Sequence, residues 1–287
     1  SVQLQLIVGA SALLSRFGKV VDMIERDGFI PDARLYSIVE GENPVTMAKS
    51  TGLAITELAT LFENLKPDIV LTVADRFETL ATAVAASYMN IVPAHTQGGE
   101  ITGSIDESVR HAITKLAHLH FPATEKAAKN ILRMGEDASS VHMVGCPAID
   151  LIAHLDLSVP DQRIMPNGVG FIVDLTKPYL VVLQHPVTTE YGNGRQQIEE
   201  TINAIDALNQ QTIWLWPNID AGSDDISKGL RLYRENKPDS KVGFFRSFNP
   251  ELYAKLIANS GCLIGNSSSA IREGSFLGVP AVNIGTR

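Results

Sequence analysis

The sequence has few cysteines and no long apolar or basic segment, and each absence excludes a class of protein. Its 287 residues include two cysteines, Cys146 and Cys262, far apart in the chain. This argues against a disulfide framework and fits a reducing, cytoplasmic location, with a single buried disulfide as the alternative. No run approaches the roughly 18 apolar residues of a membrane span. A net charge of −8 without a basic tract excludes nucleic acid and anionic membranes as expected partners.

The sequence does contain short apolar runs that alternate with helical patterns. Apolar runs such as 67–75 and 179–186 are each followed by an amphipathic segment, which predicts an α/β fold of doubly wound parallel sheets covered on both faces. The length predicts two domains. We expect an N-terminal domain over residues 1–157, a linker over 158–178 and a C-terminal domain over 179–287.

Both ends of the chain coincide with strand patterns. Residues 2–11 indicate a strand and its turn, and residues 280–287 indicate a strand whose connecting loop has just begun. A domain rarely starts and stops inside its sheet. We therefore expect a chain truncated at both ends, without the first β-α unit or the closing helices.

The ends of the N-terminal strands carry polar residues that are candidates for a site, because ligands bind beyond the carboxyl ends of parallel strands. These candidates are Asp75, His95, Gln97 and Glu100, joined by Asp106, Glu107 and Arg110 of an expected helix over 104–121. Each has a structural alternative. Asp75 and Asp106 are residue types that favour a helix N-terminus, and Gly98 and Gly99 also suit a plain turn.

Three histidines, His111, His118 and His120, fall in the expected helix 104–121. No Glu or Cys accompanies them at metal-ligand spacing, so we expect packing or surface roles rather than a zinc site.

The second half has its own strand-end candidates. His185 follows an apolar run and precedes Pro186, where it suits a general acid or a donor to phosphate; a structural histidine is the alternative. Asn218 and Asp220 again follow a strand and precede a helix.

The stretch "GNSSSAIREG" (265–274) predicts a strand-to-helix turn whose serine hydroxyls and backbone N–H groups form an anion site. It lacks the Gly-Lys-Ser/Thr of a P-loop. Glu273, one to two turns into the helix, would accept from sugar hydroxyls, and Arg287 would offer a forked cation to phosphate. A capped helix with solvent-facing serines is the alternative. These residues indicate a second domain that holds a diphosphate-like anion and a first domain that supplies carboxylates.

Taken together, these features resemble the UDP-N-acetylglucosamine 2-epimerase family, in its hydrolysing branch that forms N-acetylmannosamine for sialic-acid biosynthesis. The stretches that carry the resemblance are "ADRFETLA" (74–81), "GGEITGSIDESVRHAITKLAHLHF" (98–121), "VGCPAIDL" (144–151), "LQHPVTTE" (183–190), "WPNIDAGS" (216–223) and "GNSSSAIREGSFLGVPAVNIGTR" (265–287). The resemblance implies the GT-B arrangement, in which two Rossmann-like domains face a cleft that holds the substrate.

The resemblance also implies a chemistry. UDP is eliminated from UDP-N-acetylglucosamine to leave a 2-acetamidoglycal, and water then adds to give N-acetylmannosamine. No redox cofactor and no catalytic metal are implied, and a homodimer or homotetramer is expected. The alternatives are the same reaction on a UDP-2,4-diacetamido-trideoxy sugar (diacetylbacillosamine), a non-hydrolysing 2-epimerase, a GT-B glycosyltransferase and a non-catalytic sugar-nucleotide sensor.

The family's functional residues carry over to matching positions of this sequence. By resemblance, Asp75 and Asp106 are the catalytic carboxylates and His185 is the cleft histidine. Gln97 stands where many members have glutamate, so either Glu100 or Asp106 takes up that proton transfer, or Gln97 orients the acetamido group. The residues expected to bind UDP and the sugar are Arg110, Asn218, Ser267, Ser268, Glu273 and Arg287.

Overall fold

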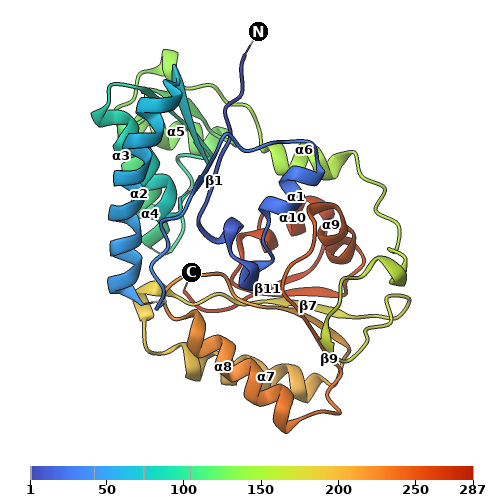
Figure 1. Ribbon diagram of the computed structural model, residues 1–287. Helices are drawn as coiled ribbons and strands as arrows, with labels where there is room; N and C mark the ends of the chain where they lie inside the picture. Colours follow the sequence, from blue (N-terminus) through green and yellow to red (C-terminus); the bar gives the residue numbers. More distant parts are fainter. Residues whose placement is uncertain (1, 42, 74, 104, 287) are drawn as a thin grey trace. The chain divides into compact units, whose positions relative to one another are not determined.

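The computed structural model describes residues 2–41, 43–73, 75–103 and 105–286, which form two compact units (Figure 1). Unit 1 comprises Ser1–Ser15 and Lys19–Cys146, and unit 2 comprises Arg16–Gly18 and Pro147–Arg287. The division falls at Cys146 rather than at the expected residue 157. The reason is that helix α6 (Pro147–Ala153) packs against α10 (Glu273–Leu277) of unit 2.

Unit 2 is built on a six-stranded sheet. Its strands, in order across the sheet, are β11 (Ala281–Asn283), β10 (Cys262–Gly265), β7 (Leu180–Leu183), β8 (Thr212–Leu215), β9 (Val242–Phe245) and β6 (Val169–Gly170). All neighbours are parallel except β6, which pairs antiparallel with β9. The expected linker 158–178 therefore contributes an edge strand and the short 3-10 helix η4 (Gln162–Ile164). The strand order reverses between β7 and β10, and this switch point is where such sheets bind ligands.

Helices cover both faces of this sheet, as the apolar runs predict. The helices α7 (Gly194–Leu208) and α8 (Ser223–Asn236) pack on one face, and α9 (Pro250–Ala258) packs on the other (Figure 1). Successive residues of β7 point to opposite faces. Val182 accordingly joins the core under α7 and α8, whereas Val181 joins the core under α9.

Unit 1 contains two parallel sheets and five α-helices among its described residues. One sheet has the order β3 (Ile69–Val73), β4 (Val92–Thr96) and β5 (Leu119–Phe121), and the other pairs β1 (Ile7–Gly9) with β2 (Ala33–Leu35). The helices are α1 (Val21–Arg26), α2 (Pro44–Leu65), α3 (Phe77–Tyr88), α4 (Ile105–Leu116) and α5 (Glu125–Arg133). Its 3-10 helices are η1 (Ala10–Leu13) and η3 (Ala138–Ser140), while η2 (Ser15–Phe17) falls at the division, with Arg16 and Phe17 in unit 2.

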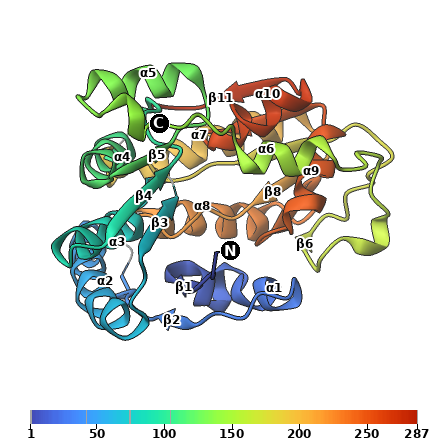
Figure 2. The same ribbon diagram turned by 90° about the horizontal axis from the view of Figure 1, so that it is seen from above.

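Helices α2 and α3 pack side by side against the strands of unit 1 (Figure 2). Leu58 and Phe62 of α2 share a core with Ala81 and Ala85 of α3. Helix α2 begins with a capping box between Asn43 and Thr46. The small alanines of α3 let the two helices approach closely.

The expected helix over 104–121 is wrong in its last five residues. Helix α4 ends at Leu116, and residues 119–121 form β5, whose His120 lies beside His95 of β4. The His118 N–H donates to the Pro93 carbonyl at 2.8 Å. Pairing with the interior strand β4 satisfies these backbone groups, so the tertiary fold overrides the local helical pattern.

An isolated parallel bridge joins His120 and Val141. No helix in the described part of the chain is long and apolar enough to cross a bilayer. Cys146 and Cys262 are free thiols, as expected.

Candidate active site

Asp75 forms an ion pair with Arg110. Asp75 follows β3, Arg110 lies on α4, and Nη2 of the arginine donates to Oδ2 of the carboxylate. The side chain of Arg110 is 2% exposed and that of Asp75 is 21% exposed. The N-cap of α3 is Arg76, which makes no side-chain capping bond. Asp75 is therefore a partly exposed carboxylate held by a buried cation, and it is not the helix cap that the sequence allowed.

The loop after β4 is fixed from three sides. The Gln97 N–H donates to the Phe121 carbonyl at 3.0 Å. The Gly99 carbonyl accepts from Asn130 Nδ2 at 2.8 Å, and the Glu100 carbonyl accepts from Arg110 Nη1 at 2.8 Å. Arg110 therefore connects this loop to Asp75. One guanidinium positions two strand-end candidates, the Asp75 carboxylate and the backbone of Glu100.

The two glycines of this loop are required by close packing. A Cβ on Gly98 would lie 2.9 Å from Nδ1 of His95. Gly99 has φ of +79°, and a Cβ there would lie 2.2 Å from the Ala127 carbonyl oxygen. The loop therefore lies directly against α5, which a plain exposed turn would not require.

Gln97 and Glu100 belong to this loop, and Asp106 follows it in the first turn of α4. Gln97 is 8% exposed, has a positive φ of 59°, and points its Nε2 toward Cys146 Sγ at 3.9 Å. Glu100 is half-buried, and so is Asp106 in the first turn of α4. Glu107 of the same turn accepts from the Thr102 N–H at 2.7 Å and so fixes the approach to α4.

The histidines of unit 1 have packing contacts. His95 is fully buried with Nδ1 3.2 Å from Thr114 Oγ1. His120 is 1% exposed, with Nε2 3.4 Å from Glu136 Oε2. Burial lowers the pKa of His120, against the opposing effect of Glu136. Over the described residues, no group of three or more His, Cys, Asp or Glu side chains is arranged to hold a metal ion.

In unit 2, His185 lies just beyond β7 at the switch point. Asn266, just beyond β10, holds the backbone of His185 on both sides. Its Oδ1 accepts from the His185 N–H at 2.7 Å, and its Nδ2 donates to the His185 carbonyl at 2.8 Å. The Asn218 N–H, beyond β8, donates to His185 Nδ1 at 3.1 Å. Three neighbouring strand ends therefore meet at this histidine.

Asn218 and Asp220 shape the entry to α8. Asn218 Nδ2 donates to Asp220 Oδ2 at 2.6 Å, and the Asp220 N–H returns a bond to Asn218 Oδ1 at 3.3 Å. Asp220 is 7% exposed, and its carbonyl accepts from the Ser223 N–H at 3.0 Å. This turn fixes the backbone that faces His185.

The three serines at 267–269 have different environments. Ser267 caps the 3-10 helix η6 (Ser268–Ala270), and its Oγ lies 2.6 Å from Ser269 Oγ. Ser269 is buried, 3.0 Å from the hydroxyl of Tyr253, whose pKa burial raises to about 12. Ser268 is exposed. Ser267, Ser269 and Tyr253 therefore form a chain of hydroxyl contacts, and Ser268 is the exposed serine of the three.

Glu273 is the first residue of α10 and not one to two turns into a helix, because η6 and α10 are separate elements. The α-helix that follows the serines is only five residues long. A helix this short adds little macrodipole to an anion site, so the turn offers mainly its local hydroxyl and N–H groups. Glu273 Oε2 is buried without a hydrogen-bond partner among the described residues. Arg287 lies outside the described residues.

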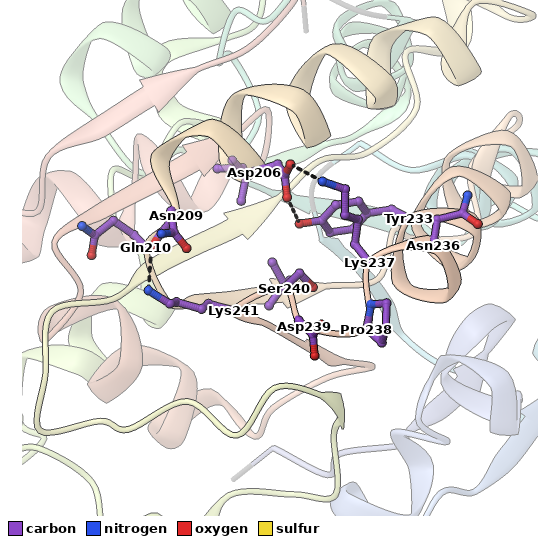
Figure 3. Close-up of a pocket in the computed structure, with 12 residues that line it drawn as sticks. Asp206, Asn209, Gln210, Tyr233, Asn236, Lys237, Pro238, Asp239, Ser240 and Lys241 are labelled. Atoms are coloured by element: carbon purple, nitrogen blue, oxygen red, sulfur yellow. Dashed lines mark hydrogen bonds and ion pairs between the residues drawn. The ribbon is translucent and has the colours of Figure 1, made fainter.

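The hollow of about 270 Å³ in Figure 3 lies elsewhere in unit 2. Gln210 and Lys241 line it, and they precede β8 and β9, so it lies at the amino ends of the strands. Three of its polar side chains pair with one another, with Asp206 accepting from Tyr233 at 3.0 Å and from Lys237 at 3.2 Å. This hollow is not the candidate site.

The sequence pattern predicted no role for three residues that contact the candidate site: Asn266, Asn130 and Tyr253. Asn266 stands beside Gly265, whose φ of +147° and whose Cβ position, 1.9 Å from the Leu183 carbonyl oxygen, admit only glycine. A Gly-Asn pair directly after a buried strand was the one available signal. Asn130 and Tyr253 act through contacts distant in sequence, which no local pattern reveals.

Comparisons with known proteins match the whole chain. Residues 1–287 match the family model described as UDP-N-acetylglucosamine 2-epimerase. The chain is 34% identical over 286 residues to UDP-N,N'-diacetylbacillosamine 2-epimerase (hydrolyzing) of Legionella pneumophila, covering 100% of this chain and 74% of that protein. It is 30% identical to UDP-N-acetylglucosamine 2-epimerase of Neisseria meningitidis, covering 100% of this chain and 73% of that protein.

Solved structures share the fold. The UDP-GlcNAc 2-epimerase of Methanocaldococcus jannaschii, crystallised with UDP-GlcNAc and UDP, superposes with a TM-score of 0.73 at 20% identity. The match covers 98% of this chain and 83% of that one. This likeness confirms the expected α/β class of two Rossmann-like domains of the GT-B type.

Proposed function

This chain belongs to the UDP-N-acetylglucosamine 2-epimerase family, and we propose that it is a hydrolysing 2-epimerase that converts UDP-N-acetylglucosamine and water to N-acetylmannosamine and UDP. The observation that carries this proposal is Asp75, a partly exposed strand-end carboxylate held in place by the buried Arg110. A fixed carboxylate is what removal of a proton from carbon requires. The hydrolysing outcome is supported by the relative whose name states it, 34% identical over the full chain.

The proposed reaction has two steps. A carboxylate takes the proton from C2 of the sugar, the C1–O bond breaks, and its electron pair leaves with UDP, so that a C1–C2 double bond remains. Water then adds its hydroxyl to C1, and a proton returns to C2 from the opposite face. Two proton-transfer groups and a stabilised leaving diphosphate are needed.

The residues of unit 1 supply the proton transfers in this proposal. Asp75 and Asp106 are the two carboxylates, with Glu100 as the alternative to Asp106. Gln97 has no proton to exchange and instead orients the acetamido group through its amide. Arg110 positions Asp75 and the Glu100 carbonyl, since its guanidinium is buried against both. This role replaces the direct substrate contact that the resemblance implied for Arg110.

The residues of unit 2 bind the nucleotide in this proposal. Ser267 and Ser268 hold the diphosphate through hydroxyl and N–H groups of their turn. Glu273 accepts from a sugar or ribose hydroxyl, and this would give its buried Oε2 a partner. Asn218 contacts the nucleotide side, His185 donates to the diphosphate, and Arg287 adds a cation.

A second candidate is the same reaction on a UDP-2,4-diacetamido-trideoxy sugar. It is favoured by the name of the Legionella pneumophila relative, whose 34% identity exceeds the 30% of the Neisseria meningitidis enzyme. The two substrates differ at C4 and C6 of the sugar, away from the C1 and C2 atoms where bonds change. The same catalytic residues therefore serve both.

The test is proton NMR of each sugar nucleotide incubated with the protein in D2O. The proposal expects free N-acetylmannosamine with deuterium at C2 from UDP-N-acetylglucosamine, without any acceptor present. The same label in the diacetamido sugar alone would establish the second candidate. A UDP-bound sugar with exchanged C2 would indicate the non-hydrolysing reaction. Retention of the C2 proton in both substrates would overturn epimerisation by this chain.

A matched pair of variants assigns the chemistry to the strand end. Asp75→Asn should lower kcat by roughly 10²–10⁴ while UDP still binds. Asp68→Asn is the control, because Asp68 is exposed at the opposite end of the same strand. Equal activity of the two variants would remove Asp75 from the catalytic residues.

A further inference from the structure

His185 is held by its backbone as well as by its ring. Asn266 accepts from the His185 N–H and donates to the His185 carbonyl, and the Asn266 N–H donates to the Leu183 carbonyl at 3.3 Å. Asn266 is 5% exposed. The segment that follows β7 is therefore held to the end of β10, and the Cα of His185 cannot shift without breaking hydrogen bonds to the buried Asn266.

The hydrogen bond at Nδ1 determines which nitrogen of the His185 imidazole carries the proton. Nδ1 of His185 accepts from the Asn218 N–H at 3.1 Å, and a nitrogen that accepts a hydrogen bond carries no proton. In the neutral ring the proton then resides on Nε2. A proton on Nδ1 would point at the Asn218 N–H, so this arrangement favours one tautomer.

Only an amide side chain satisfies both backbone groups of His185. A carboxylate of the same shape accepts from the N–H but has no proton for the carbonyl, and a serine is too short to reach both. The position beside Gly265 brings the amide close enough, because the Gly265 backbone lies against the Leu183 carbonyl. The residue type at 266 is thus dictated by the task of holding His185.

We propose that Asn266 is a positioning residue that aligns His185 with the Asn218 N–H and so holds His185 as the Nε2–H tautomer, a neutral hydrogen-bond donor toward an anionic diphosphate oxygen. The alignment itself is a property of the folded protein. The catalytic consequence rests on the function proposed above.

The tautomer is measured directly by long-range nitrogen–proton NMR of the full chain labelled with 15N-histidine, at about pH 8, above the usual histidine pKa. The His185 signals are assigned by their loss in His185→Gln. We expect the Nε2–H pattern in the wild type, and a mixture of tautomers in Asn266→Ala. Asn266→Asp is the second variant, for use if Asn266→Ala does not fold. It keeps the shape of the side chain and one of its two hydrogen bonds to His185, and it should also give a mixture of tautomers.

The catalytic arm compares kcat and KM. We expect Asn266→Ala to lower kcat roughly 10–100-fold, the scale of a misplaced catalytic group, with KM changed much less. The matched control is Asn249→Ala. Asn249 caps α9 by accepting from the Leu252 N–H at 2.7 Å, so its loss destabilises unit 2 without touching His185. The control should keep kcat and the tautomer.

The outcomes separate the two proposals. An Nδ1–H pattern in the wild type, or an unchanged Nε2–H pattern in both variants at position 266, overturns the positioning role whatever the enzyme does. An equal loss of kcat in Asn249→Ala would reduce the effect to stability and overturn it as well. A wild-type Nε2–H pattern that Asn266→Ala disturbs, in a protein that releases no amino sugar, upholds the alignment and overturns the proposed function.

Discussion

Asp75 and Arg110 form an ion pair across 35 residues of sequence, with the cation almost wholly buried and the carboxylate partly exposed. A buried guanidinium is costly unless its hydrogen bonds are satisfied. Here Nη2 bonds Asp75 and Nη1 bonds the Glu100 carbonyl, while the buried Nε has no hydrogen-bond partner among the described residues. The cation fixes the exposed carboxylate in place, and the carboxylate in turn keeps the cation paired.

Arg110→Lys tests this arrangement. Lysine keeps the charge but loses the planar fork that reaches Asp75 and the Glu100 carbonyl together. We expect the free energy of unfolding to fall by about 1–3 kcal/mol and kcat/KM to fall at least about tenfold. Urea denaturation and steady-state kinetics measure the two effects. The control is Lys129→Ala, which removes an exposed pair with Glu125 and should cost less than about 0.5 kcal/mol. Equal costs would contradict a structural role for the Arg110 pair.

Gly99→Ala tests the packing of the loop after β4. The added Cβ would lie 2.2 Å from the Ala127 carbonyl oxygen, in a residue with φ of +79°. We expect a loss of stability above about 3 kcal/mol, since a backbone clash adds to the strain of the left-handed region. Gly135→Ala separates the two causes, because Gly135 has φ of +91° with nothing within 4 Å of its Cβ. It should cost only about 1–2 kcal/mol. Matching thermal shifts would show that strain alone matters at Gly99.

Ser267 and Ser268 should differ when each is changed to alanine. Ser267 caps η6 and bonds Ser269, whereas Ser268 is exposed. We expect Ser268→Ala to weaken UDP binding roughly 2–10-fold with stability unchanged within about 0.5 kcal/mol. Ser267→Ala should weaken binding and also lower stability by about 1 kcal/mol. Calorimetric titration and thermal denaturation measure both. Unchanged UDP affinity in Ser268→Ala would remove that hydroxyl from the binding site.

His120 should make stability depend on pH. Burial lowers its pKa from the ordinary 6.5, against the raising effect of Glu136 and with a smaller lowering effect of Lys115. A depressed pKa in the folded state contributes stability that is present above the unfolded value, about 6.5, and lost as pH falls through the folded value. The free energy of unfolding of the wild type should therefore fall more steeply from about pH 7 to 5 than that of His120→Asn. His154→Asn, an exposed site, should follow the wild type. Parallel curves for wild type and His120→Asn would contradict the burial effect.

The sequence predicts the strands of this fold well where apolar runs end in a polar residue. β3 before Asp75 lies within the expected run 67–75, and β7 before His185 lies within the expected run 179–186. β7 is apolar throughout because both of its faces are covered, whereas every second side chain of β3 is exposed. The sequence predicts secondary structure poorly where pairing with a neighbouring strand determines it. Residues 119–121 follow a helical pattern, yet they form β5 and pair with β4 in the sheet.

The residues of the candidate site also fall into those that the sequence predicts and those that it does not. Asp75, Gln97, His185 and the serines could be found because strand ends and turns mark them in the sequence. The burial of Arg110 could not, since charged residues are rarely buried unless a partner distant in sequence neutralises them. The role of Asn266 likewise depends on its hydrogen bonds to His185, 81 residues away, which no local pattern predicts.

The hydrogen bonds among Ser267, Ser269 and Tyr253 fix side-chain rotamers that a looser turn would leave to fluctuate. The conformational entropy of ordering these hydroxyls is therefore lost during folding and not on encounter with an anion. A ligand that binds this turn meets a preorganised surface, and its association should carry a small entropic penalty from the protein.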